Sequence, residues 1–150
     1  GEADPEKPRR VDIAVLCASL ADDASDHGHA VRYEGPSHLE HAVRPSSFRR
    51  AVTNLVDNAI HYGREVVVRL EKRPGHVCLH VEDDGPGIPD ESLALVLEPF
   101  VRLDNARGRD TAGFGLGLSI VARAAAAEGG SLDLTNRAEG GLRATIALPG

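Results

Sequence analysis

The sequence from residue 47 to residue 62 reads SFRRAVTNLVDNAIHY. At 100° per residue, its apolar side chains fill one continuous arc of a helix: Phe48, Ala51, Val52, Leu55, Val56, Ala59 and Ile60. On the opposite arc, Asn54, Asn58 and His61 form a narrow stripe. A solvated face would usually carry Glu, Lys and Arg instead. Two carboxamides one turn apart suit Mg²⁺ held together with phosphate oxygens, so this face is a candidate binding face as well as a candidate solvated one.

Outward from this helix, the remaining sequence alternates helical and strand-like patterns. Further helices are expected at residues 11–24, 91–97 and 116–128. Strands are expected at residues 30–35, 39–43, 65–70, 76–82, 131–135 and 142–148. The first two strands flank a turn at Gly35, and the next two form a hairpin around Gly75. Ser46 or Ser47 is expected to cap the central helix, and residues 102–111, with almost no apolar content, are expected to form a mobile loop. The pattern predicts an α+β fold with a mixed or antiparallel sheet covered by helices.

Composition bounds the class of protein. The chain has 150 residues and a formal charge of −6, without a basic block, which disfavours nucleic-acid binding because phosphate contacts supply most of that affinity. No run of 18 apolar residues is present, so no membrane span is expected. Cys17 and Cys78 have no CxxC spacing and are interpreted as small buried residues in a reducing compartment. The seven His are scattered and are interpreted as ordinary residues rather than metal ligands.

The N-terminal residues predict a boundary. The sequence contains no Met, so we expect it to be part of a longer protein. Its first nine residues, GEADPEKPR, are charged and rich in Pro, which is typical of disorder. We therefore expect residues 1–10 to be a linker or cloning remnant and residues 11–150 to form one domain.

Two glycine-bearing segments are candidate ligand loops. Residues 81–89, VEDDGPGIP, end a strand, and glycine permits close backbone approach to a ligand. An Asp at such a strand end can accept a hydrogen bond from an exocyclic amine, although Asp-Gly-Pro-Gly is also a common turn. Residues 113–118, GFGLGL, lead into the helix expected from residue 116, where backbone NH groups and the helix dipole favour anions. A plain flexible turn is the alternative interpretation of this second loop.

Four motifs in a fixed order resemble the catalytic ATP-binding domain of bacterial two-component sensor histidine kinases. Residues 54–63 look like their asparagine box, and residues 83–88 and 113–118 look like their two glycine boxes. The sequence EPFVR at residues 98–102 looks like their phenylalanine box, in a variant similar to that of osmosensor-type kinases. The resemblance covers residues 11–149. It implies a two-layer α/β sandwich, the Bergerat ATP-binding fold of the wider superfamily, with about five mostly antiparallel strands and about three helices.

Residue by residue, the resemblance implies a Mg-ATP site. Asn58 would coordinate Mg²⁺ with Asn54 close by, Asp83 would accept the adenine amino group, and Tyr62 would pack against the base. Arg102 would approach the γ-phosphate, and with Asn58 it forms the expected catalytic pair. The remaining expected nucleotide-binding residues are His61, Gly85, Gly87, Ile88, Gly113, Phe114, Gly115, Leu116, Gly117 and Leu118. His61 departs from the family, which usually carries Lys or Arg there, so its phosphate contact is expected to depend on pH.

The resemblance also implies partners. The family's acceptor histidine is followed by an acidic residue in a helical hairpin, and none of the seven His here has one. We therefore expect a separate dimerisation domain to supply that histidine, and a cognate response regulator to receive the phosphoryl group on an aspartate. The fragment is expected to bind ATP but not to autophosphorylate alone, as a cytoplasmic domain of a parent anchored in the cell membrane. The alternatives are an anti-sigma-type serine kinase and a non-catalytic nucleotide-sensing module.

Overall fold

A five-stranded mixed sheet, with the strand order β2-β4-β5-β7-β6, forms the centre of the fold. The computed structural model describes residues 6–89 and 108–150, and only the backbone of residues 108–117. The strands are β2 (Ala30–Glu34), β4 (Glu65–Arg73), β5 (His76–Asp83), β6 (Ser131–Asn136) and β7 (Leu142–Pro149). The pair β2–β4 is parallel, while β4–β5, β5–β7 and β6–β7 are antiparallel.

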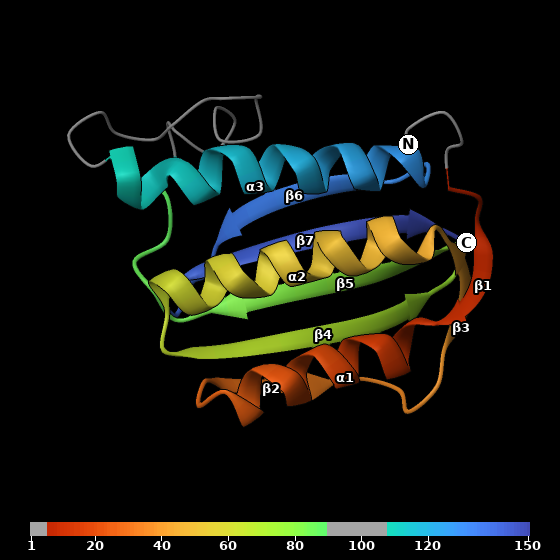
Figure 1. Ribbon diagram of the computed structural model, residues 1–150, viewed down its shortest axis with the longest axis horizontal. Coiled ribbons are helices and arrows are strands. Elements are labelled where there is room, and N and C mark those ends of the chain that lie inside the picture. Colours follow the sequence, from red (N-terminus) through yellow and green to blue (C-terminus); the bar gives the residue numbers. More distant parts are fainter. Residues whose placement is uncertain (1–5, 90–107) are drawn as a thin grey trace.

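Three helices cover one face of this sheet (Figure 1). They are α1 (Ile13–Asp26), α2 (Pro45–Tyr62) and α3 (Gly108–Ala127). A small second sheet pairs β1 (Arg9–Asp12) with β3 (Glu40–Val43). This arrangement confirms the predicted two-layer α/β sandwich with a mixed, mostly antiparallel sheet.

Alternation along the central strands explains the core. In β5, Val77, Leu79 and Val81 are buried while the residues between them face the other side of the sheet. Six of the seven residues on the apolar arc of α2 are buried against this face, and Ile60 is half-buried. The predicted helical face is therefore confirmed, and it fixes which side chains of α2 remain available to a ligand.

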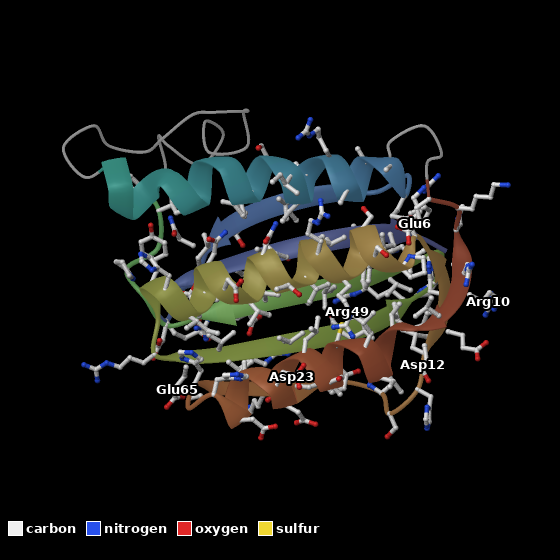
Figure 2. The ribbon with its side chains drawn as sticks, in the orientation of Figure 1. Glu6, Arg10, Asp12, Asp23, Arg49 and Glu65 are labelled. Atoms are coloured by element: carbon white, nitrogen blue, oxygen red, sulfur yellow. The ribbon has the colours of Figure 1, made fainter. Side chains whose placement is uncertain are left out.

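Acidic side chains bind the backbone NH groups where the first two helices begin. Asp12 caps α1 by accepting a hydrogen bond from Val15 N at 3.1 Å, so the helix begins at Ile13 instead of residue 11. The carboxylate of Glu6 accepts hydrogen bonds from Ser46 N at 2.8 Å and Ser47 N at 3.0 Å at the start of α2 (Figure 2). The predicted serine cap is therefore wrong, because Pro45 opens the helix and the acidic residue is supplied from outside it.

Three further expectations differ from the structure. Residues 30–35 and 39–43 do not form a hairpin, since β2 joins β4 and β3 joins β1. The predicted disorder is wrong for residues 6–10, because Glu6 binds the start of α2 and Arg9 begins β1. Helix α3 begins at Gly108 instead of residue 116, so the predicted loop is wrong over residues 108–111. The rest of that loop and the helix expected at residues 91–97 lie outside the described residues.

In the described residues, no helix is both long and apolar enough to span a bilayer.

Candidate functional site

The two polar residues that line one small cavity beneath α3, Asn58 and Asp83, are both predicted site residues. Asn58 comes from α2 and Asp83 from the end of β5, because α2 packs across that strand. The cavity has a volume of about 10 Å³ and an otherwise apolar lining: Leu55, Ala59, Val81, Leu118, Leu142 and Ala144. Apolar walls with a few polar groups are the usual composition of a small-molecule site.

The carboxylate of Asp83 is held firmly at the edge of this cavity. Its Oδ1 accepts a hydrogen bond from Gly85 N at 2.8 Å and a longer one from Leu142 N at 3.4 Å. Burial raises the pKa of Asp83, since desolvation penalises the charged form more than these two NH groups favour it. No hydrogen bond within the described residues uses Oδ2, so this oxygen is available to an exocyclic amine.

Asn58 contributes a buried polar atom that the described residues leave unsatisfied. Its Nδ2 is buried, and no acceptor in that part of the chain lies within hydrogen-bonding distance. Buried amide groups in native proteins nearly always have a partner, and an exception needs an explanation. A polar ligand entering the cavity would supply one, so the donor set fits a nucleotide.

The loop after β5 is shaped by close backbone packing. A Cβ at Gly85 would lie against the carbonyl oxygen of Tyr62, so the loop can run alongside the end of α2 only with glycine there. Ile88 is buried with 2% of its surface exposed, which anchors the loop in the core. The predicted residues Gly85, Gly87 and Ile88 thus position the strand end that carries Asp83.

The remaining predicted residues of α2 do not line the small cavity. Tyr62 is half-buried, and its ring makes an edge contact with the exposed ring of His61 at a centroid distance of 4.4 Å. Asn54 is half-buried one turn before Asn58. The structure therefore separates Asn58 and Asp83, which line the small cavity, from Asn54, His61 and Tyr62, which do not.

The second glycine segment is the largest departure from expectation. Gly113, Gly115 and Gly117 lie within α3, with five helical residues before the first of them, and not at its N-terminus. Their NH groups are therefore in the helix ladder rather than at an anion-binding end. Phe114 and Leu116 belong to the part of α3 whose backbone alone is described, and Arg102 lies outside the described residues. Of this segment, Leu118 is the residue that lines the cavity.

The small cavity is too small to admit a nucleotide unless its walls move. Sites for small molecules have volumes of roughly 300–1,000 Å³, far more than the 10 Å³ found here. Leu118 of α3 forms one wall, so displacement of this helix would enlarge the space. The three glycines make the first turns of α3 weak, because each Gly in a helix interior costs about 1 kcal/mol relative to Ala.

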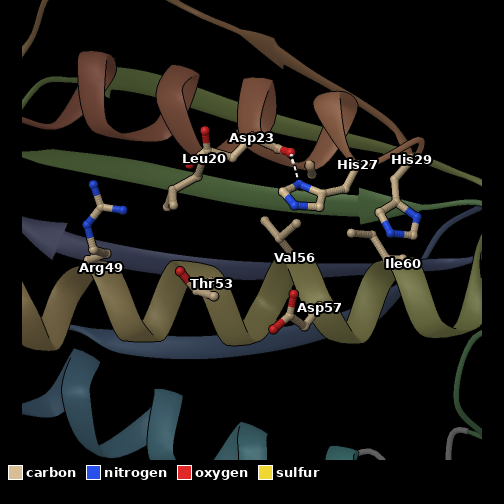
Figure 3. A pocket seen from close by; sticks show the side chains of 10 residues that line it. Leu20, Asp23, His27, His29, Arg49, Thr53, Val56, Asp57 and Ile60 are labelled. Carbon is tan, nitrogen blue, oxygen red and sulfur yellow. Dashed lines mark hydrogen bonds between the residues drawn. The ribbon is translucent and has the colours of Figure 1, made fainter.

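A larger cavity, of about 470 Å³, lies between α1 and α2 (Figure 3). Leu20, Val56 and Ile60 contribute apolar walls, while Asp57 and His29 lie toward one end and Arg49 toward the other. Burial raises the pKa of Asp57, with a smaller opposing effect of His29. None of the predicted site residues lines this cavity, so volume alone does not identify the site.

A metal ion at this site would need few protein ligands. In the described ranges, no group of three or more His, Cys, Asp or Glu could hold one. The amide oxygens of Asn58 and Asn54 suit Mg²⁺, which commonly takes one or two protein ligands and completes its shell with water and phosphate.

Sequence reasoning missed three residues that support the site. Asp84 accepts hydrogen bonds from Arg64 N and Glu65 N at 2.7 and 3.1 Å, which ties the end of β5 to the start of β4. Asn136 and Arg137 approach the same loop from β6. The consecutive glycines before Leu142 were a usable signal, because a Cβ at Gly141 would lie against the carbonyl oxygen of Asp83.

Comparison with known proteins gives a consistent result. Residues 43–150 match the family described as histidine kinase-, DNA gyrase B-, and HSP90-like ATPase. The chain is 39% identical over 144 residues to the sensor histidine kinase GtrS of Pseudomonas aeruginosa, covering 96% of this chain but only 29% of GtrS.

Two solved structures extend this likeness to the fold. The ATP-binding domain of PrrB from Mycobacterium tuberculosis has a TM-score of 0.80 at 28% identity, covering 97% of this chain and 98% of that one. The histidine kinase domain of the E. coli osmosensor EnvZ has a TM-score of 0.73 at 33% identity, covering 98% and 91%. Both share the fold over nearly the whole chain.

Proposed function

Because the chain belongs to the histidine kinase-, DNA gyrase B- and HSP90-like ATPase family and aligns with sensor histidine kinases, we propose that it binds Mg-ATP and supplies the γ-phosphoryl group to a histidine of a dimerisation domain. The phosphoryl group then passes to an aspartate of a cognate response regulator. The chain spans 29% of the length of GtrS, so the acceptor histidine, the regulator and a membrane anchor belong to the proposal.

The observation that supports this proposal best is the pairing of Asp83 with Asn58 in an apolar cavity. Asp83 offers one free carboxylate oxygen beside apolar walls, which suits an adenine ring with its amino group toward the carboxylate. The Nδ2 atom of Asn58 is buried and has no hydrogen-bond partner in the described residues. An unused carboxylate oxygen and an unsatisfied amide NH beside apolar walls support the proposal that a nucleotide is the ligand.

The proposed chemistry depends mainly on positioning. Phosphoryl transfer is accelerated when the nucleotide is held in line with its acceptor and the negative charge is neutralised. Asn58, with Asn54 close to it, would hold Mg²⁺, which neutralises phosphate charge. Arg102 would approach the γ-phosphate, and Tyr62 would cover the base. The NH groups of Gly113, Gly115 and Gly117 would receive phosphates only after the start of α3 unwinds.

The proposed cellular setting follows from the reaction. ATP is available on the cytoplasmic side of the cell membrane, so we place this domain there, in a parent protein anchored in that membrane. The relatives described as sensors support this setting, since a sensor must connect a stimulus to the kinase.

An Asn58→Ala variant tests the nucleotide site directly. We expect Mg²⁺-dependent ATP binding, measured by calorimetry, to weaken by at least tenfold while binding in EDTA changes little. The control is Asp57→Ala, which removes a neighbouring polar side chain that does not line the small cavity. Equal ATP affinity of Asn58→Ala and the unaltered chain in Mg²⁺ would sink the assignment.

Phosphotransfer in trans tests the acceptor. The chain is mixed with labelled ATP and the dimerisation domain of its parent, and acid-labile label on that domain is expected. Label on a protein serine would support the anti-sigma-type alternative instead. ATP binding without transfer to either acceptor would favour a nucleotide-sensing module.

A further inference from the structure

Residues at the end of β6 contact the loop that follows β5. The last residues of β5 and β6 and the first residues of β7 lie at the same end of the sheet, on the left in Figure 1. From this position the hairpin between β6 and β7 reaches the strand end that carries Asp83.

Asn136 binds the backbone of Ile88 through both ends of its side-chain amide. Its Oδ1 accepts a hydrogen bond from Ile88 N at 2.9 Å, and its Nδ2 donates to Ile88 O at 2.6 Å. A side chain that satisfies the NH and the CO of one residue fixes both the position and the orientation of that backbone segment. The loop is therefore held by a residue that lies 48 positions further along the chain.

Gly87 makes this contact possible. Its φ of 78° is in the left-handed region, and a Cβ at this position would lie against Oδ1 of Asn136. The absence of a side chain lets the amide of Asn136 reach the next residue. A glycine of the predicted loop thus serves a protein contact in addition to any contact with ligand.

Arg137 holds the strand end itself. Its guanidinium donates a hydrogen bond from NH1 to the carbonyl oxygen of Asp83 at 2.7 Å. Its own backbone NH binds Gly141 O at 2.8 Å, which fixes the hairpin from which the side chain projects. The Asp83 backbone is therefore held by Arg137, while its carboxylate is held by Gly85 N and Leu142 N.

We propose that Asn136 and Arg137 are positioning residues for base recognition, which set the place of the Asp83 carboxylate through the backbone of residues 83–88. This inference rests on the proposed function. An amine is recognised only when donor and acceptor lie about 2.7–3.2 Å apart with good alignment, so a loosened strand end weakens that bond selectively. Apolar contacts of the base tolerate the same displacement.

The closing experiment compares ATP with purine riboside triphosphate, which lacks the exocyclic amine. Calorimetry is done on the full chain, its Asn136→Ala and Arg137→Gln variants, and Thr135→Ala as a matched control. Thr135 is the neighbouring exposed residue of β6, and no hydrogen bond of its side chain occurs in the described ranges. We expect the preference for ATP over the analogue to fall about tenfold in both variants and to stay unchanged in the control.

Hydrogen exchange supplies a readout without nucleotide. The amide of Ile88 is expected to exchange at least tenfold faster in Asn136→Ala than in the unaltered chain, since its acceptor is gone. Both nucleotides losing affinity equally, or a lower melting temperature with an unchanged preference, would overturn the inference and leave a structural role. Absence of ATP binding by the unaltered chain would instead contradict the proposed function, and this inference with it.

Discussion

At the scale of single residues, Asp83 combines two demands that oppose each other. Burial raises its pKa, and the NH groups of Gly85 and Leu142 offset this only in part. A carboxyl whose pKa is raised in the folded state destabilises the fold at neutral pH, and protonation relieves that cost as pH falls toward the ordinary value of 3.8. Recognition of an amine needs the charged form, so acidification acts on stability and on binding in opposite directions.

The affinity for ATP is expected to depend on the protonation of Asp83. ATP affinity of the unaltered chain is expected to fall on acidification at a pH above 3.8, because protonated Asp83 loses an acceptor. Asp83→Asn should bind ATP roughly tenfold more weakly or worse, since hydrogen bonds to charged groups contribute about 1.5–3 kcal/mol. Calorimetry from pH 4 to 8 on both proteins separates this effect from titration of the nucleotide, which is common to them. Parallel pH profiles would contradict the role of Asp83.

Two neighbouring glycines allow a matched test of close packing. Both Gly140 and Gly141 have a positive φ, of 107° and 96°, so an Ala at either position costs about 1–2 kcal/mol of backbone strain. Only a Cβ at Gly141 also meets the carbonyl oxygen of Asp83, while the space at Gly140 is open.

Gly141→Ala is therefore expected to lower the free energy of unfolding more than Gly140→Ala and to abolish ATP binding. Urea denaturation and calorimetry measure the two effects. Similar losses of stability in both variants, with ATP binding retained, would show that the contact with Asp83 is unimportant.

At the scale of elements, Arg44 joins three segments at the start of α2. Its side chain donates to Ala127 O at 2.8 Å, pairs with Glu128 at 3.3 Å and donates through Nε to Glu6 O at 3.1 Å. The Glu128 side chain is only 6% exposed, against 30% for Arg44. The N-terminal segment, α2 and the end of α3 thus meet at one guanidinium, on the helices that flank the small cavity.

Removal of Arg44 is expected to cost more than removal of the whole pair. Arg44→Ala removes the ion pair of the buried Glu128 and leaves the backbone NH of residue 44 as the remaining partner of its Oε2, at 2.8 Å, so the fold should be destabilised by roughly 1–3 kcal/mol. The double variant Arg44→Ala with Glu128→Ala should recover part of that loss. Thermal and urea denaturation of the three proteins measure the difference, and strict additivity would count against a coupled pair.

The elements that sequence predicted best are those whose pattern is local. The apolar arc of α2 and the alternation in β4 and β5 repeat within one segment, and these elements were found. Contacts distant in sequence were not readable: β2 joins β4 through a parallel pairing, and Glu6 caps α2. The same distinction holds for the site residues. Asn58 and Asp83 were predicted from local motifs, whereas Asn136 was missed because it contacts a loop 48 residues away in the sequence. The start of α3 was misplaced because the glycines signalled a break that the helix crosses.

At the scale of the whole molecule, ligand binding adds to the stability of the folded domain. Binding to the folded state alone adds about 2.7 kcal/mol of stability when the ligand is at 100 times its Kd. For a domain of this size, 1 kcal/mol corresponds to about 2–4 °C.

ATP with Mg²⁺ is therefore expected to raise the melting temperature by about 5–11 °C at that concentration. Differential scanning calorimetry measures the shift, and Asn58→Ala at the same nucleotide concentration is the control. No shift in the unaltered chain at ATP concentrations up to 10 mM would contradict a nucleotide site of useful affinity.

The N-terminal segment limits how far the chain can be shortened without loss of structural contacts. A shorter chain starting at residue 11, where the sequence suggests the boundary, would lose half of β1 and the carboxylate of Glu6. The freed edge of β3 would then present unpaired backbone groups to other molecules, which is a known route to aggregation. Residues 6–10, which the sequence suggests are a linker, thus cover part of the edge of β3 and the start of α2.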